Sequence, residues 1–230
     1  MSQGIIPRFL IACRNQLSSS RALARRYGQF RSMRSLECVD ANGMPIPWYT
    51  YPAIEYLDHL DFSKLTVFEY GSGNSTLWWA KRALSVTSVE NDENWYEKIQ
   101  GMIKSRQADD SRTSYLLEAD RGSYIASLSK PHDVVIVDGR FRKACVEHLL
   151  SSDTAGNVSM LIFDNSDWYP QTIQIVRESL GWLEVDFHGF GPINRYTWTT
   201  TVFVNPENRH VLKYARDLHS VAGFVKNAES

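Results

Sequence analysis

The first 36 residues of this 230-residue chain contain no Asp, Glu or Lys. The charged residues in this stretch are all arginines: Arg8, Arg14, Arg21, Arg25, Arg26, Arg31 and Arg34. The remainder holds the other 18 basic residues and all 26 acidic ones, so a body of net charge −8 follows a segment of +7. Phosphate backbones require clustered positive charge on the domain that binds them, and an acidic body therefore predicts no nucleic-acid partner.

Cysteines and long apolar runs are also scarce. Cys13, Cys38 and Cys145 lie far apart and form no Cys-x-x-Cys pair, which excludes a disulfide framework or a zinc ribbon. Reduced thiols of this kind favour a cytoplasmic protein. No run approaches the roughly 20 apolar residues that span a bilayer, and the apolar run from Phe9 is too short for a secretory signal.

The arginine-rich segment carries apolar residues at helical spacing: Ile5, Phe9, Cys13, Leu23, Tyr27 and Phe30. Three interpretations fit this composition: an organellar transit peptide, an amphipathic helix on a membrane surface, and a basic helix packed on the acidic body. We expect residues 1–42 to form a basic amphipathic helical extension and residues 43–230 to form one α/β domain. Residues 1–36 are the part expected to contact a membrane or a partner.

From residue 65 onward, short apolar segments alternate with helical ones. The expected strands are Leu65–Tyr70, Val86–Glu90, Ser114–Glu118, Asp133–Asp138, Met160–Asp164, Leu183–Phe187 and Thr197–Val204. The expected helices are Ala53–Leu60, Ser75–Leu84, one from Asn91 or Asp92 to Ile103, Arg142–Leu150, Gln171–Leu180 and a closing helix over Asn205–Val225. This alternation predicts a mostly parallel sheet with helices on both faces. The last two strands are too close in sequence for a parallel crossover, so they are expected to pair antiparallel.

A glycine-rich turn follows the first of these strands. Glu69 is followed by Gly71 and Gly73, a helix begins directly afterwards, and Glu90 ends the next strand. Glycines let a ligand approach the backbone, and the N–H groups of a helix start point at it. An acid at the end of the second strand can accept hydrogen bonds from both ribose hydroxyls of an adenosine.

Two features of the turn argue against a dinucleotide. Thr76 stands where the third glycine of the dinucleotide fingerprint belongs. The carboxylate of Glu69 would repel a pyrophosphate, whereas it would attract an ammonium group. The residues therefore favour an adenosine ligand that carries an amino acid.

At this point the sequence resembles the class I S-adenosylmethionine-dependent methyltransferases over roughly residues 65–204. The resemblance implies a Rossmann-like α/β fold with a seven-stranded mixed sheet whose last strand is antiparallel. It also implies S-adenosylmethionine as the cofactor. The cofactor contacts that it implies are Glu69, Gly71, Gly73, Ser75, Glu90, Asn91, Asp120 and Asp138.

A second group of polar residues ends the fourth and fifth strands. Asp138, Asp164 and Asn165 offer hard oxygen ligands suited to Mg²⁺, at the strand ends where open α/β sheets bind ligands. The trio is similar to that of the metal-dependent catechol-type O-methyltransferases, where a metal lowers the pKa of a substrate hydroxyl. Helix capping by the two aspartates, or a contact with the cofactor, is the alternative interpretation.

The residues expected to remove the proton from the acceptor hydroxyl do not match the positions of the base in the related enzymes. Lys143 lies five positions after Asp138, and Arg140 stands where related enzymes have a histidine. Arg140 and Arg142 indicate an anionic or polyhydroxylated substrate. His188, in the loop region before the last strand, is a further candidate general base. The expected catalytic residues are thus Asp138, Lys143 and His188.

We therefore expect an enzyme that methylates a hydroxyl of a small molecule or sugar, with or without a divalent metal. Short stretches such as Phe68–Ala80 are similar to FkbM-type sugar and polyketide O-methyltransferases and to plant polysaccharide O-methyltransferases. Two alternatives remain open. One is a related adenosine-binding aminopropyl transferase, and the other is a catalytically silent module whose basic segment docks to a membrane or partner.

Overall fold

Seven strands form one sheet at the centre of the protein. The structure, a computed structural model, describes residues 7–105, 112–208, 212–215 and 220–223. The sheet has the order β4-β3-β2-β5-β6-β8-β7. Its strands are β2 (Thr66–Tyr70), β3 (Ser85–Glu90), β4 (Thr113–Leu117), β5 (Val134–Val137), β6 (Met160–Asp164), β7 (Leu183–Gly189) and β8 (Trp198–Val204).

The strand directions confirm the predicted topology. Strands β2 to β6 pair parallel with one another, whereas β8 pairs antiparallel with both β6 and β7. The order turns back at the β2–β5 pair, so the loops after these two strands leave the sheet in opposite directions. That reversal is where an open α/β sheet leaves room for a ligand.

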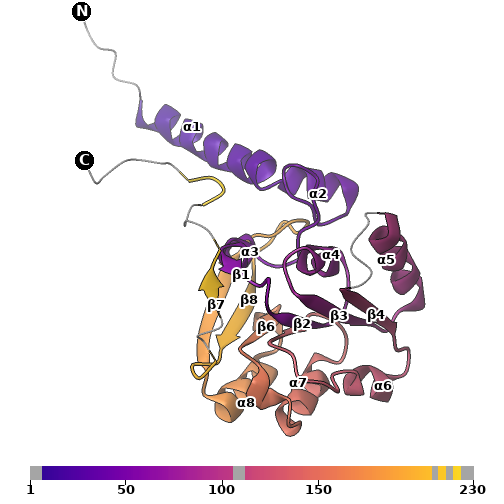
Figure 1. Ribbon diagram of the computed structural model, residues 1–230. Coiled ribbons are helices and arrows are strands. Elements are labelled where there is room, and N and C mark those ends of the chain that lie inside the picture. The colour runs from indigo at the N-terminus through magenta and orange to yellow at the C-terminus, as the bar shows by residue number, and fades with distance from the viewer. Residues whose placement is uncertain (1–6, 106–111, 209–211, 216–219, 224–230) are drawn as a thin grey trace, which may run out of the picture.

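Helices cover both faces of the sheet (Figure 1). One face carries α3 (Tyr51–Asp58), α4 (Asn74–Ala80) and α5 (Glu93–Ser105), and the other carries α6 (Arg121–Ala126), α7 (Arg142–Ser151) and α8 (Pro170–Leu180). The central strands alternate their side chains between two apolar cores. Val67 and Ile136 pack beside Trp79 of α4, whereas Phe68 and Val137 belong to the core under α7 and α8. Because both faces of these strands are buried, their consecutive residues are apolar.

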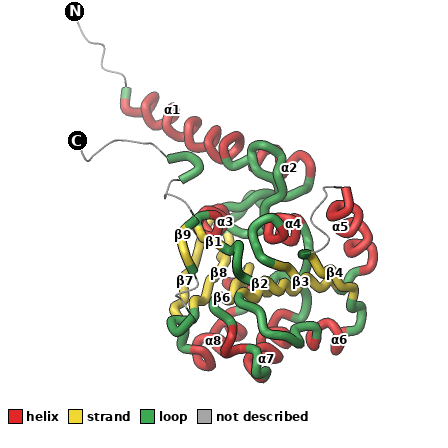
Figure 2. Tube along the Cα trace, viewed as in Figure 1, coloured by secondary structure: helices red, strands yellow, loops and turns green. Residues whose placement is uncertain are grey.

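The C-terminal part of the chain differs from the prediction. A closing helix over Asn205–Val225 is wrong for the described residues of that range, because β9 (Lys213–Tyr214) pairs antiparallel with β1 (Leu60–Asp61) as a small second sheet. The remaining residues of the range, 209–211, 216–219, 224 and 225, lie outside the described part of the chain. Figure 2 shows β9 beside β1, at the edge of the larger sheet.

The arginine-rich segment splits into two parts with different surroundings. The first part is α1 (Arg8–Arg21), which continues through a π-helical turn (Ala22–Arg26) and extends away from the sheet (Figures 1 and 2). None of its residues is buried. The second part begins with α2 (Gln29–Ser35), whose Gln29 donates from Nε2 to the carbonyl oxygen of Gly191 at 2.9 Å. A separate unit ending at residue 42 stays a prediction.

Candidate functional site

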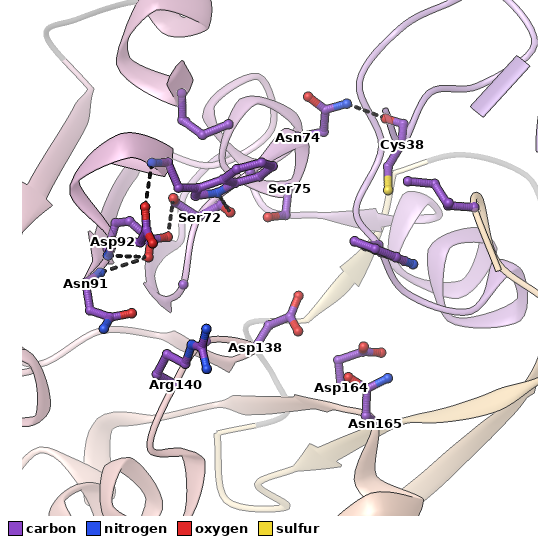
Figure 3. A pocket seen from close by; sticks show the side chains of 18 of the residues that line it. Cys38, Ser72, Asn74, Ser75, Asn91, Asp92, Asp138, Arg140, Asp164 and Asn165 are labelled. Atoms are coloured by element: carbon purple, nitrogen blue, oxygen red, sulfur yellow. Dashed lines mark hydrogen bonds between the residues drawn. The ribbon is translucent and has the colours of Figure 1, made fainter. Parts of the chain in front are cut away.

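A cavity of about 950 Å³ opens at the carboxyl ends of β2, β3, β5 and β6. Two groups of residues face each other across it. The β2–β3 side comprises Gly71–Ser75 and the start of α5, and the β5–β6 side comprises residues 138–142 with Asp164 and Asn165. Figure 3 shows Ser72 and Ser75 on one side and Asp138, Arg140 and Asp164 on the other.

The glycine turn is held tightly against the neighbouring strand end. Gly71 has a φ of 98°, and its N–H donates to the carbonyl oxygen of Val89 at 2.9 Å. A Cβ atom on Gly71 would lie 2.9 Å from Cα of Gly139, which leaves no room for a side chain. Gly73 is different, since a Cβ atom there would meet only Ser75 Oγ, at 3.9 Å. The first glycine is thus required by the fold, whereas the second leaves open space beside the cavity.

Glu69 lies behind this turn and is buried. Its Oε2 accepts hydrogen bonds from Thr76 Oγ1 at 2.6 Å and from Ser88 Oγ at 3.0 Å. Oε1 is buried without a hydrogen-bond donor among the described residues. Burial raises the pKa of Glu69 to about 7, against the lowering effect of the hydroxyl groups of Ser75, Thr76 and Ser88. Glu69 is not among the residues that line the cavity; it supports the turn from beneath.

Glu90 lines the β2–β3 side. Its Oε1 accepts the backbone N–H groups of Asn91 at 2.8 Å and Asp92 at 3.1 Å, and its Oε2 accepts Ser72 Oγ at 2.7 Å. These bonds fix the carboxylate at the cavity wall. A carboxylate oxygen can accept more than one hydrogen bond, so Oε2 retains capacity for a ligand hydroxyl.

A flat apolar surface adjoins Glu90. Trp95 is 39% exposed, and its indole Nε1 donates to the carbonyl oxygen of Ser72 at 2.9 Å. Lys98 Nζ lies 4.4 Å from the centroid of that ring. Ile99 and Met102 of α5 continue the wall. A fixed indole beside aliphatic side chains is suited to a purine ring.

Asp120 lies elsewhere. Its carboxylate caps α6 by accepting the N–H of Ser123 at 2.9 Å, and these hydrogen bonds lower the pKa of Asp120. It is not among the residues that line the cavity. Ser75 and Asn91, by contrast, both line it.

On the β5–β6 side, an arginine connects the two strand ends. Arg142 Nη2 donates to Oδ1 of Asp138 at 3.0 Å, and Arg142 Nη1 donates to Oδ1 of Asn165 at 3.2 Å and to the carbonyl oxygen of Asp164. The side chain of Arg142 is only 10% exposed, and that of Asp138 is 20% exposed. The positively charged group that contacts Asp138, Asp164 and Asn165 is therefore the guanidinium of Arg142.

The carboxylate of Asp164 is tied to the antiparallel strand. Its Oδ1 accepts Trp198 Nε1 at 3.0 Å and Thr200 Oγ1 at 2.5 Å. Burial raises the pKa of Asp164 well above its ordinary range, and the neighbouring Asp138 raises it further. Burial also raises the pKa of Asp138, although Arg142 opposes this. The two carboxyl groups thus share a site in which a proton is held more firmly than in water.

This arrangement does not fit the expected Mg²⁺ site. Oδ1 of Asp138 and Oδ1 of Asn165 accept hydrogen bonds from Arg142, and Oδ1 of Asp164 accepts from Trp198 and Thr200 of β8, which leaves at most Oδ2 of each aspartate for an ion. A dication beside this guanidinium would be repelled by it. In the described ranges, no group of three His, Cys, Asp or Glu side chains is placed to hold a metal ion.

The structure does not bring the other two expected catalytic residues to the cavity. Lys143 is exposed on α7, where its Nζ lies 3.7 Å from Oε1 of Glu147. His188 is on β7, and its Nδ1 shares a 2.7 Å hydrogen bond with Thr199 Oγ1. Neither lines the cavity. Lys143 follows Arg142 on the helix and therefore points to another face of it.

One wall of the cavity comes from residues that sequence reasoning identified only in part. Leu36, Glu37, Cys38 and Trp48 line it, although they precede the first strand of the sheet. Asn74 Nδ2 donates to the carbonyl oxygen of Cys38 at 2.6 Å, which attaches this segment to the start of α4. The aromatic-proline segment Pro47–Pro52, which contains Trp48, predicts either a cover over a cofactor or core packing, whereas Leu36, Glu37 and Cys38 were missed.

Comparisons with known proteins bear on the fold. No protein-family model and no curated protein matches the sequence. A candidate O-methyltransferase from Klebsiella pneumoniae has a similar structure, with a TM-score of 0.50, 16% identity, and coverage of 67% of this chain and 78% of that one. The O-methyltransferase TomG from Streptomyces achromogenes, solved with S-adenosylmethionine, gives a TM-score of 0.50, 13% identity, and coverage of 67% and 78%. An uncharacterized Listeria monocytogenes protein matches over 64% of each chain, with a TM-score of 0.45 and 13% identity.

The similarity to the two O-methyltransferases, together with the strand order, shows that the chain has a Rossmann-like fold of the kind that its sequence predicts.

Proposed function

We propose that the protein transfers a methyl group from S-adenosylmethionine to a hydroxyl oxygen of a small molecule or sugar. The observation that carries this proposal is one continuous cavity with two chemically different sides. Its β2–β3 side offers the fixed carboxylate of Glu90 and the indole of Trp95, and its β5–β6 side offers the paired carboxyl groups of Asp138 and Asp164.

The residues of the β2–β3 side suit the nucleoside of the cofactor. Glu90 would accept the ribose hydroxyls, and Trp95 with Ile99 and Met102 would cover the purine ring. The tight approach of Gly71 to Gly139 keeps the loops after β2 and β5 free of side chains where the cofactor would cross between them. When bound, S-adenosylmethionine supplies a methyl group activated by its positive sulfonium sulfur.

The residues of the β5–β6 side suit the acceptor. Burial gives Asp138 a raised pKa, so its carboxylate can take the proton of the acceptor hydroxyl as the oxygen bonds to the methyl carbon. Arg142 holds one oxygen of Asp138 and leaves Oδ2 as the basic atom. Trp48 and the segment that carries Cys38 line the cavity, where they would limit the access of water to the reacting atoms.

Turnover with a panel of sugars and phenols tests the proposal, with release of S-adenosylhomocysteine as the readout. We expect turnover with at least one hydroxyl acceptor, and we expect Asp138→Asn to lower kcat by about 100-fold while cofactor binding is retained. Cofactor binding without turnover on any acceptor would favour the silent module instead. Methylation confined to nitrogen acceptors would contradict transfer to oxygen.

A second candidate role concerns α1, which we propose to contact an anionic membrane surface. Phe9 and Leu17 are 73% and 62% exposed, and with Cys13 between them they share one face of the helix. Arg14 and Arg21 flank that face, and no acidic residue lies in residues 1–36. Exposed apolar side chains beside arginines match the chemistry of an anionic lipid surface. In the described part of the chain, no helix is long and apolar enough to cross a bilayer.

Vesicle co-sedimentation tests this surface. Phe9→Ser with Leu17→Ser should abolish binding to vesicles of phosphatidylcholine with phosphatidylglycerol, whereas Ser18→Ala on another face should not. Deletion of residues 1–21 should have the same effect as the double substitution and leaves α2 in place. Binding to pure phosphatidylcholine alone, or a concentration-dependent dimer that the deletion abolishes, would overturn the membrane assignment.

A further inference from the structure

The guanidinium of Arg142 has a hydrogen-bond acceptor for each of its N–H groups. Nε donates to the carbonyl oxygen of Gly139 at 3.0 Å, and Nη2 donates to the carbonyl oxygen and Oδ1 of Asp138 at 3.1 and 3.0 Å. Nη1 donates to the carbonyl oxygen of Asp164 and to Oδ1 of Asn165. An arginine has five N–H groups, so none is left over for a substrate.

The five acceptors come from the two strand ends that were expected to hold a metal. Three of them are main-chain carbonyl oxygens after β5 and β6, and two are side-chain oxygens of the expected ligands Asp138 and Asn165. Both loops contain a residue in the left-handed region, Phe141 at φ 54° and Asn165 at φ 53°. The five acceptors surround a planar cation whose fork matches them.

The guanidinium is also enclosed. Its Cζ lies 5.3 Å from the ring centroid of Tyr169 and 5.9 Å from that of Phe163. The side chain begins at the first residue of α7, so its origin is fixed by the helix. A side chain that is both enclosed and fully hydrogen-bonded cannot swing away to admit an ion without breaking all of these contacts.

We infer that the guanidinium of Arg142 occupies the position where the sequence predicts a divalent ion. In that position it orients Asp138 and Asn165 for a reaction that requires no metal. The inference rests on the proposed function for the reaction, whereas the metal-binding part of its test does not. Arg142 is a positioning residue, because it acts on the acceptor through Asp138. Asp138, Asp164 and Asn165 thus all accept hydrogen bonds from a guanidinium, Asp164 through its carbonyl oxygen.

The first arm of the test uses the unaltered protein. Titration with Mn²⁺, followed by electron paramagnetic resonance, should show no ion bound at Asp138 up to millimolar concentrations. EDTA should leave the Kd for S-adenosylhomocysteine and the turnover unchanged within twofold. Mn²⁺ binding that Asp138→Asn abolishes would overturn the inference, even if cofactor binding and turnover stand. Absence of cofactor binding would instead contradict the proposed function. The Mn²⁺ titration would still decide whether Arg142 occupies the expected metal position.

The second arm uses Arg142→Ala and Arg142→Lys, with Lys143→Ala as the matched control. Arg142→Ala should lower kcat by at least tenfold with a smaller change in KM for the cofactor, and should gain Mn²⁺ affinity by at least tenfold. Lys143→Ala removes an exposed positive charge from the next position of α7, outside the cavity, and should gain none. Arg142→Lys keeps the charge but loses the fork, so it should lower kcat without gaining Mn²⁺ affinity. Unchanged kcat in Arg142→Ala would overturn the positioning role, and the first arm applies even if that variant fails to fold.

Discussion

The two sides of the cavity are built in different ways. On the β2–β3 side, Glu90 is oriented by backbone N–H groups and by the hydroxyl of Ser72, all within 20 residues along the chain. On the β5–β6 side, Asp164 is held by Trp198 and Thr200, more than 30 residues away. Contacts between residues that are close in the sequence can be predicted from its local pattern, whereas contacts between distant strands cannot. Substitutions on the two sides should therefore have separable effects on cofactor binding and on turnover.

The largest effect is expected where the two sides meet. Gly71→Ala places a Cβ atom 2.9 Å from Gly139 and forces alanine to a φ of 98°, which should cost about 3 kcal/mol or more of unfolding free energy. Gly73→Ala is the matched control in the same turn, since its Cβ atom would meet only Ser75 Oγ. Urea denaturation measures both variants. Equal stability of the two would contradict the close approach.

The next effect concerns the acid beneath the turn. The pKa of Glu69 is raised from its ordinary value of 4.5 to about 7 in the folded protein, so the unfolded chain releases this proton first as the pH rises. This group should therefore lower stability progressively between pH 4.5 and 7, by up to about 3 kcal/mol. In Glu69→Gln that loss should be absent, so the variant gains on the wild type across this window. A constant stability difference at all pH values would show that the pKa is not raised.

Glu90 tests the β2–β3 side alone. Glu90→Ala should weaken binding of S-adenosylhomocysteine by about 10- to 100-fold, the usual loss for a charge-assisted pair of hydrogen bonds. Glu93→Ala, an exposed acid at the start of α5, is the control and should bind as the wild type does. Calorimetry measures both. Equal weakening in the two variants would indicate a general effect of negative charge.

The smallest effect on cofactor binding is expected from Asp164. Asp164→Asn keeps an Oδ1 that can accept from Trp198 and Thr200, so binding of S-adenosylhomocysteine should change by less than about threefold. Any loss should be confined to turnover. A large loss of cofactor binding would show that the two sides are not independent.

The fold could be predicted almost completely from the sequence. Apolar runs such as the one at Val134–Val137 are unambiguous when both faces of a strand are buried, and the short link before Trp198 forces an antiparallel pair. The C-terminal helix was wrong because Lys213 and Tyr214, inside its expected range, pair with β1. Pairing with a distant strand has no local signal.

The candidate site could be predicted in part. Glu90 and the glycine turn were recognised because they lie close together in the sequence, at a spacing typical of a nucleoside site. The structure places both at the cavity. Arg142 was expected to bind substrate, since nothing in the sequence shows that five oxygens from two loops surround it. Cys38 was missed because it comes from outside the motif-bearing region, whereas Trp48 belongs to the aromatic-proline segment that predicts either a pocket cover or core packing.

Calorimetric titration of the wild-type protein with S-adenosylhomocysteine, without metal or acceptor, tests the central claim most directly. The account predicts saturable binding at one site with micromolar affinity, unchanged by EDTA. Absence of saturable binding at millimolar ligand would contradict it, because the cavity would then lack the ligand that its β2–β3 side is proposed to hold.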